Sequence, residues 1–138
     1  MRVSQRLDHV LRALTFLAQR EDQTPVAAKT IAEELGLPRR FLETQLSLLS
    51  AQGLVEARRG AGGGCSLARP AAEITVRQVV EALEGEILDV PHTSGSAVAR
   101  MWEDAAEALS EYLDATTLQD LARLQSRLDG ERAPVYHI

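Results

Sequence analysis

The sequence predicts a mainly helical domain with one small β-hairpin, and three observations lead to this fold class. Apolar residues recur at three- and four-residue spacing in six separate stretches of the 138-residue chain. A glycine-rich run at 60–64 separates two short stretches of β-strand character. Hydrophobic residues make up 45% and charged residues 25% of the chain, which is ordinary for a globular protein.

Three helices are expected in the first half of the chain, over 2–20, 27–35 and 38–52. A polar break separates the first two, and Gly36 is typical of a residue that ends a helix. The third begins with Pro38, which suits a first helical turn because its missing N–H has no partner there. The buried face of this third helix is predicted to consist of Phe41, Leu42, Leu46 and Leu49.

The period changes after Gly53, where 54–59 and 65–68 are predicted to form two strands joined by the glycine turn. Two short helices with a tight turn, followed by such a hairpin, give the order of a winged helix-turn-helix. The second helix of that unit can enter the major groove of DNA, which is about 12 Å wide.

The second half of the chain is predicted to be helical. Thr75 and Gln78 form a capping-box pattern that opens a helix ending at Gly85, and further helices follow over 96–114 and 118–129. The apolar stripe of the long helix is expected to contain Val98, Met101, Trp102, Ala105, Leu109, Tyr112 and Leu113. Because a monomer of this size is too small to bury this stripe, we expect a homodimer.

Four parts are therefore expected. They are a winged helix-turn-helix DNA-binding domain over 1–85, a linker over 86–95, dimerisation helices over 96–130 and a flexible tail over 131–138. The charge is distributed unevenly between the two halves of the chain. Residues 1–70 carry ten Arg or Lys and seven Asp or Glu, whereas residues 71–138 carry five Arg or Lys and thirteen Asp or Glu. The net charge of −5 thus comes from an acidic back half, and the mildly basic front half suits a polyanion.

A series of short motifs runs along most of the chain. They are Ile31-Ala32-Glu33, Gly36-Leu37, Phe41-Leu42-Glu43, Gly53-Leu54-Val55, Arg59-Gly60-Ala61-Gly62-Gly63-Gly64, Leu67-Ala68-Arg69-Pro70 and Ala82-Leu83-Glu84-Gly85. In this order they resemble the Rrf/BadM family of bacterial winged-helix transcription regulators. The resemblance implies a dimeric repressor that reads two half-sites of a near-palindromic operator in double-stranded DNA.

The chain departs from that family at four places, one of which is Cys65, where the family usually has a tyrosine after the glycines. Family members that hold an iron–sulfur cluster carry three cysteines in the linker before the long helix, and here that linker has none. A regulator without an iron–sulfur cluster or other cofactor is therefore expected, responding to a small-molecule or redox effector. Gln45 stands where the family usually has a leucine-type residue, and Pro38 where it usually has a serine N-cap.

The candidate DNA-contacting residues of the third helix are polar and lie mostly off its apolar face. They are Arg39, Arg40, Glu43, Thr44 and Ser47. Arginine can bind guanine through two hydrogen bonds, and glutamate can accept one from cytosine N4. The alternative is a solvated helix surface with an Arg39–Glu43 or Arg40–Thr44 pair.

The predicted wing supplies a second set of candidates, Arg58, Arg59, Gly62 and Gly63. Glycines allow the backbone to approach DNA closely, and arginine suits either a phosphate or the minor groove. The alternative is an ordinary hairpin with arginines for solubility. Arg2 and Arg6 are further candidates for phosphate contacts, with a solvated first helical turn as the alternative.

Cys65, the single cysteine, has two interpretations. Nearby arginines could lower the pKa of its thiol and make it a redox sensor, or the sulfur could be buried and inert. His92 with Asp89 could bind a metal between subunits, but no His or Cys pair has ligand spacing, so no metal site is expected.

The composition also excludes several classes of protein. One cysteine cannot form a disulfide within the chain, and neither a signal peptide nor a membrane-spanning run is visible, so we expect a cytoplasmic protein. No catalytic motif is present, so an enzyme is not expected. The favoured function is sequence-specific transcriptional regulation. The alternative is a winged-helix module that docks a protein partner through its acidic C-terminal arm.

Overall fold

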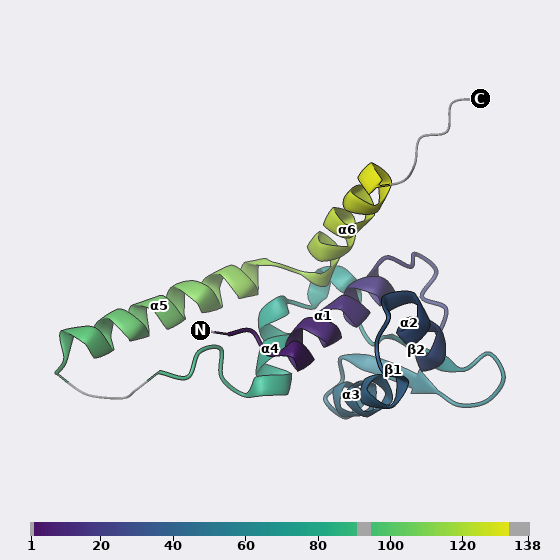
Figure 1. Cartoon of the computed structure of the whole chain (residues 1–138), viewed down its shortest axis with the longest axis horizontal. Coiled ribbons are helices and arrows are strands. Elements are labelled where there is room, and N and C mark those ends of the chain that lie inside the picture. The colour runs from purple at the N-terminus through teal and green to yellow at the C-terminus, as the bar shows by residue number, and fades with distance from the viewer. Residues whose placement is uncertain (1, 91–94, 133–138) are drawn as a thin grey trace.

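The computed structural model describes residues 2–90 and 95–132 (Figure 1). Its elements are α1 (Gln5–Ala18), α2 (Ala28–Leu35), α3 (Arg39–Ala51), β1 (Val55–Arg58), β2 (Gly64–Leu67), the 3-10 helix η1 (Ala71–Glu73), α4 (Val76–Glu84), α5 (Ala97–Ala115) and α6 (Leu118–Arg132). The strands form one antiparallel hairpin in which Val55 faces Leu67 and Arg58 faces Gly64. The predicted class, mainly helical with a small hairpin, is therefore confirmed.

The core lies around α1. Leu14 of α1 is fully buried, together with Ile31 of α2 and Leu42 and Leu49 of α3, and Leu118 at the start of α6 joins the same cluster. Burial of this many aliphatic side chains, each contributing about 1.5–3 kcal/mol, holds the helix-turn-helix against α1. The position of α3 is thus set by its inner face, and its outer face stays free.

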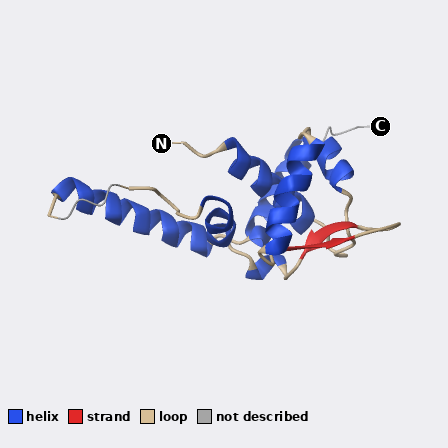
Figure 2. Cartoon of the chain, turned by 90° about the horizontal axis from the view of Figure 1, so that it is seen from below, coloured by secondary structure: helices blue, strands red, loops and turns tan. Residues whose placement is uncertain are grey.

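Helix α5 is an arm. It extends away from the body in both views (Figures 1 and 2). Among its residues only Ala99 is buried, although α5 also contacts α4, so most of the surface of this helix is not covered by the body. The C-terminal end of the arm is anchored by two backbone hydrogen bonds. N of Val76 donates to O of Thr116 at 2.8 Å, and N of Leu118 donates to O of Ile74 at 2.9 Å.

The segment before α2 pairs with the hairpin. Val26 forms an isolated antiparallel bridge with Cys65, beside Gly64. Gly64 has a φ of +144°, and a Cβ there would lie 2.5 Å from the carbonyl carbon of Val26. Only glycine allows this approach, so the wing is fixed directly to the entry of the helix-turn-helix.

Two local predictions differ from the structure, and one element was not predicted. Pro38 is the N-cap of α3, in extended conformation, rather than its first helical residue, because a residue that precedes a helix has non-helical ψ. Gly130 does not end α6, which continues to Arg132, so the helix enters the segment expected to be tail. The 3-10 turn η1 was not predicted. Residues 91–94 of the linker and 133–138 of the tail lie outside the described residues.

Candidate nucleic-acid interface

The outer face of α3 carries the polar residues selected from the sequence. Arg39, Arg40, Glu43, Thr44 and Ser47 are all exposed. The opposite face is apolar and buried, with Leu42, Leu46 and Leu49 packed into the core. Phe41 is half-buried at the border between the two faces, where its ring meets His9 of α1 edge-on at 5.8 Å between centroids.

Two interactions organise this outer face. Nε of Arg39 donates to Oε1 of Glu43 at 2.7 Å, which is an i,i+4 ion pair along the helix. The hydroxyl of Thr44 donates to the backbone oxygen of Arg40 at 3.0 Å. Arg39 and Glu43 are therefore already oriented relative to each other, whereas the Arg40 side chain forms no ion pair with any described residue.

Gln45, which stands where the family usually has a leucine-type residue, lies on the inner face of α3. It is buried, and its Oε1 has no hydrogen-bond partner among the described residues. The helical period places position 45 between Phe41 and Leu42 around the axis, so the polar side chain is carried into the core. Gln45 therefore does not belong to the exposed face.

The wing presents two exposed arginines. Arg58 ends β1 and Arg59 begins the turn, and both are exposed, as is Gly62. Gly63 is half-buried because the chain folds back on itself there, and a Cβ would lie 2.4 Å from the carbonyl oxygen of Arg58. Thus Gly63 has a packing role in the turn besides any contact with DNA.

Helix α3 and the hairpin occupy the same end of the molecule, away from α6 (Figure 1). Seen from below, α3 lies in front and the hairpin beside it (Figure 2). The end of α3 packs directly on β1. The exposed arginines of α3 and of the wing therefore lie at the same end of the molecule, which is the arrangement that lets a helix enter a groove while a hairpin meets the adjacent backbone.

The two N-terminal candidates for phosphate contacts, Arg2 and Arg6, differ in their surroundings. Arg2 is exposed, but Nη2 of Arg6 donates to the backbone oxygen of Leu83 at 2.8 Å, at the C-terminal turn of α4. Arg6 is half-buried, and its guanidinium caps that helix. Arg6 thus has a structural partner that competes with a phosphate.

Lys29 was not selected from the sequence. It is exposed in the first turn of α2. In helix-turn-helix proteins the first helix crosses the DNA backbone, so its position in the motif was the signal that could have identified it.

The thiol of Cys65 is buried in β2. Burial raises the pKa of Cys65 to about 11, because the thiolate would lose its hydration. The lowered pKa that a redox sensor requires is therefore absent, and the shift favours the inert interpretation. The arginines of the wing do not contribute to the shift.

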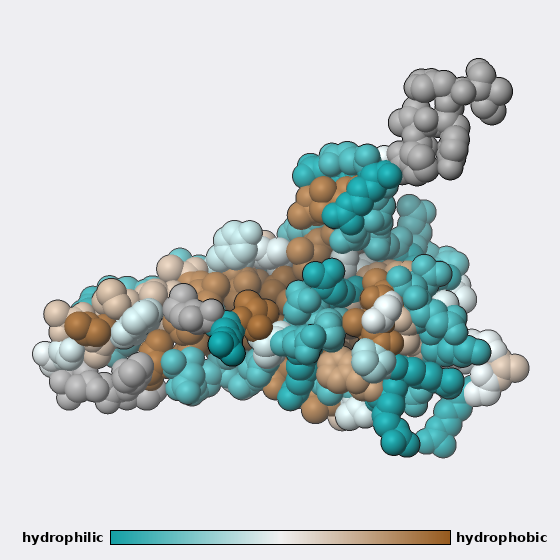
Figure 3. Space-filling view, viewed as in Figure 1, coloured by the Kyte–Doolittle hydropathy of each residue, from teal (hydrophilic) through white to brown (hydrophobic). Residues whose placement is uncertain are grey.

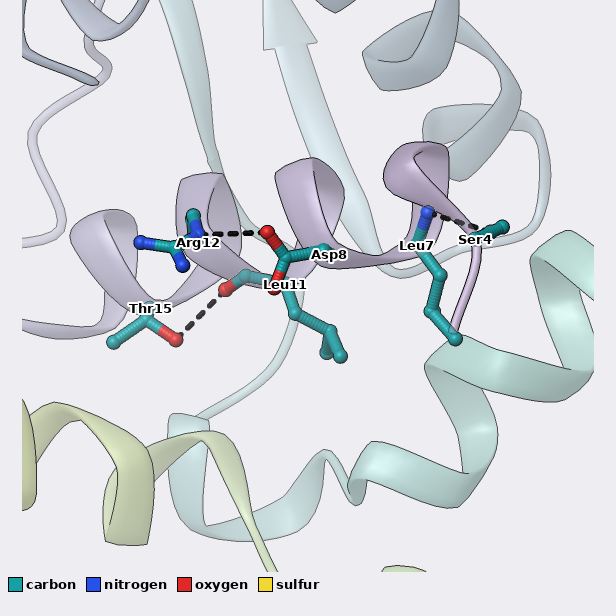
Figure 4. A network of polar contacts seen from close by, with 6 residues as sticks. All are labelled: Ser4, Leu7, Asp8, Leu11, Arg12 and Thr15. Carbon is teal, nitrogen blue, oxygen red and sulfur yellow. Dashed lines mark hydrogen bonds and ion pairs between the residues drawn. The ribbon is translucent and has the colours of Figure 1, made fainter. Parts of the chain in front are cut away.

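A groove of about 600 Å³ lies on the other side of the helix-turn-helix, between α1, the end of α2 and α6. Its α1 wall carries Asp8 and Arg12, joined at 2.8 Å, and Thr15, which donates to the oxygen of Leu11 (Figure 4). On the α6 side, hydrogen bonds from Gln125 and Gln19 hold the pKa of Asp129 below its ordinary value. The hydrogen bonds that Gln19, at the C-cap of α1, donates to Ser126 and Asp129 join the end of α1 to α6.

No group of three or more His, Cys, Asp or Glu side chains among the described residues gathers as a metal site. Within the same residues, no helix is long and apolar enough to cross a membrane. His92 lies outside the described residues, so the pair with Asp89 is not seen.

The fold and this surface define a winged helix-turn-helix DNA-binding protein. The chain belongs to the Rrf2 family, described as an iron-dependent transcriptional regulator, which matches residues 3–124. The HTH-type transcriptional regulator CymR of Bacillus subtilis is 34% identical over 96% of this chain and 95% of its own length. The HTH-type transcriptional repressor NsrR of Streptomyces coelicolor is 35% identical over 88% of both chains.

Solved structures agree with these relatives. The structure of CymR, the global cysteine regulator of B. subtilis, has a TM-score of 0.82 and 32% identity, over 90% of this chain and 98% of that one. T. potens IscR has a TM-score of 0.81 and 34% identity, over 99% and 95%. The predicted resemblance, the winged-helix fold and the assignment to transcriptional regulators rather than enzymes are confirmed.

Proposed function

We propose that this chain is a homodimeric repressor that binds a near-palindromic operator through α3 and the wing, without an iron–sulfur cluster. The observation that carries the proposal is that α3 packs against β1 of the hairpin at one end of the molecule, where Arg39 and Arg40 of α3 and Arg59 of the wing are all exposed. Base edges are read from the helix, and Arg58 and Arg59 meet the backbone or minor groove.

The dimer is supported by the arm. Four large apolar side chains of α5 are exposed: Val98, Met101, Leu109 and Tyr112, with exposed fractions from 38% to 69%. Figure 3 shows hydrophobic surface running along the arm and on to the body. A monomer rarely leaves such a continuous apolar surface in water, and pairing of two arms across a two-fold axis covers it.

The donors of this chain do not fit the iron–sulfur cluster of some family members. Cys65 is the single cysteine, and it is buried in the wing strand, far along the chain from the linker. We therefore derive no step through a cluster. The effector acts at the linker or the arm, where a small change in the angle between subunits alters the spacing of the two α3 helices.

The test is a salt titration on duplex DNA enriched from a random-sequence pool by the wild-type protein. A dimer that neutralises phosphates gives a steep negative slope of log affinity against log salt, and prefers the enriched duplex over a scrambled one. Arg39→Ala combined with Arg40→Ala removes that preference. A flat slope, with no enrichment, overturns the proposal and favours a module that docks proteins through the acidic arm.

A further inference from the structure

The ion pair between Arg39 and Glu43 is exposed on both sides. The Arg39 side chain keeps 62% and that of Glu43 keeps 51% of its accessible surface. Exposed pairs of this kind contribute little to stability, because water and salt screen them. What the pair does change is the freedom of the Arg39 side chain, since a charge-assisted hydrogen bond of 2.7 Å fixes the plane of the guanidinium.

The atom used in the pair determines which donors remain. A guanidinium has five N–H groups in one plane, and Glu43 accepts only the one on Nε. The edge formed by the two terminal nitrogens stays available. Guanine presents N7 and O6 to the major groove at a spacing that this edge matches, and this is the commonest specific arginine–base contact.

We propose that Arg39 reads a guanine in each half-site and that Glu43 is its positioning residue, holding the guanidinium rather than contacting a base. The inference rests on the proposed DNA-binding function. It replaces the prediction that Glu43 accepts a hydrogen bond from cytosine.

Position and charge both support these roles. Arg39 is the first residue of α3, and the first residues of a recognition helix are those that meet base edges. A carboxylate alone at this surface is repelled by the phosphates, whereas a carboxylate paired with arginine is neutralised locally. Arg40, one residue on, has no such partner among the described residues and serves as the matched control.

The experiment is a double-mutant cycle on base preference, using the enriched duplex and versions of it with single base-pair changes. Arg39→Ala should reduce the preference for one G·C pair in each half-site by roughly tenfold or more. Glu43→Ala should weaken the same preference less, and the double variant should be no worse than Arg39→Ala. Glu43→Gln, which keeps an acceptor oxygen without the charge, should fall between Glu43→Ala and wild type.

The control pairs Arg40→Ala with Glu43→Ala, whose effects should add because these two side chains share no contact in the described structure. The unfolding midpoint of each variant should be unchanged, which shows that the variant folds. If Glu43 had only a structural role, its substitution would shift this midpoint. Additive effects of Arg39→Ala and Glu43→Ala, or a loss of preference for cytosine at another position in Glu43→Ala, overturn the inference while the proposed function stands. Failure of the wild type to enrich any duplex overturns both.

Discussion

Val26 and Cys65 exchange both of their backbone hydrogen bonds. N of Cys65 donates to O of Val26, and N of Val26 donates to O of Cys65, each at 2.9 Å. The segment that leads into α2 thereby becomes a one-residue third strand beside β2. The root of the wing is fixed to the helix-turn-helix, while the turn at Arg59 to Gly63 extends beyond it. Changes in the turn should therefore affect DNA binding without unfolding the domain.

Gln45→Leu should stabilise the protein. The buried Oε1 of Gln45 has no partner in the described structure, and leucine removes the cost of burying it at a similar volume. The free energy of unfolding in urea should rise by about 1 kcal/mol. Gln52→Leu is the matched control, because Nε2 of Gln52 donates to the oxygen of Ala82 at 2.8 Å and gains nothing from the change. A loss of stability in Gln45→Leu contradicts the prediction.

Stability should fall at alkaline pH because of Cys65. The folded pKa is raised from 9.0 to about 11, so the folded state holds the proton more tightly than the unfolded chain. The stabilising contribution is complete below pH 9 and is lost as the pH rises toward 11, by about 1–3 kcal/mol. Urea unfolding at several pH values measures it.

Cys65→Ala is the control for that titration. It should lower stability at neutral pH, because a buried side chain is shortened, but should remove the decline between pH 9 and 11. A thiol reagent should label native Cys65 far more slowly than the urea-unfolded chain. Rapid labelling of the native protein would return the sensor interpretation.

Arg59→Ala should weaken binding to most DNA sequences alike. Arg59 is exposed in the wing, where phosphate contacts position the protein without reading bases. The slope of log affinity against log salt should flatten by about one unit for each subunit. A larger loss on A·T-rich sites would assign Arg59 to a narrow minor groove. Arg100→Ala, which removes an arginine from the arm, should leave the slope unchanged.

Leu109→Glu combined with Tyr112→Glu should yield monomers. Both side chains are exposed on one face of α5, and two carboxylates there prevent the pairing of apolar faces. Sedimentation at micromolar concentration should report half the wild-type mass, and operator affinity should collapse with it. Arg100→Glu makes the same change in net charge on the opposite face of the helix and should stay dimeric. A dimeric double variant refutes the role of the arm.

Local signals allowed much of this fold to be predicted. The spacing of Thr75 and Gln78 predicted a capping box, and both of its hydrogen bonds are present. The pair Arg39–Glu43 was expected as an alternative from its four-residue spacing, and it forms. Signals of this kind depend on residues within one turn of each other, so a single sequence contains them.

Distant contacts could not be predicted in the same way. Arg6 is bound to the oxygen of Leu83, 77 residues later, and no local pattern announces such a partner. Gln45 is a different case, since its angular position on α3 did indicate burial and its polar side chain argued against it. The third strand at Val26 has no sequence signature either, because a single bridging residue lacks any period.

The hydrogen bonds at Thr116 and Leu118 make α5 a lever with its fulcrum at its C-terminal end. Nineteen helical residues reach about 28 Å at 1.5 Å each. A tilt of about 5° at the fulcrum therefore moves the far tip by about 2.5 Å, roughly half the rise of one helical turn. In the proposed dimer each arm is joined at its C-terminal end to the DNA-binding part of its own subunit. A movement at either end of α5 is therefore transmitted to the other end. A small displacement near Ser96 therefore becomes a small rotation, with a larger force, at the C-terminal end of α5. This end is hydrogen-bonded to the first turn of α4.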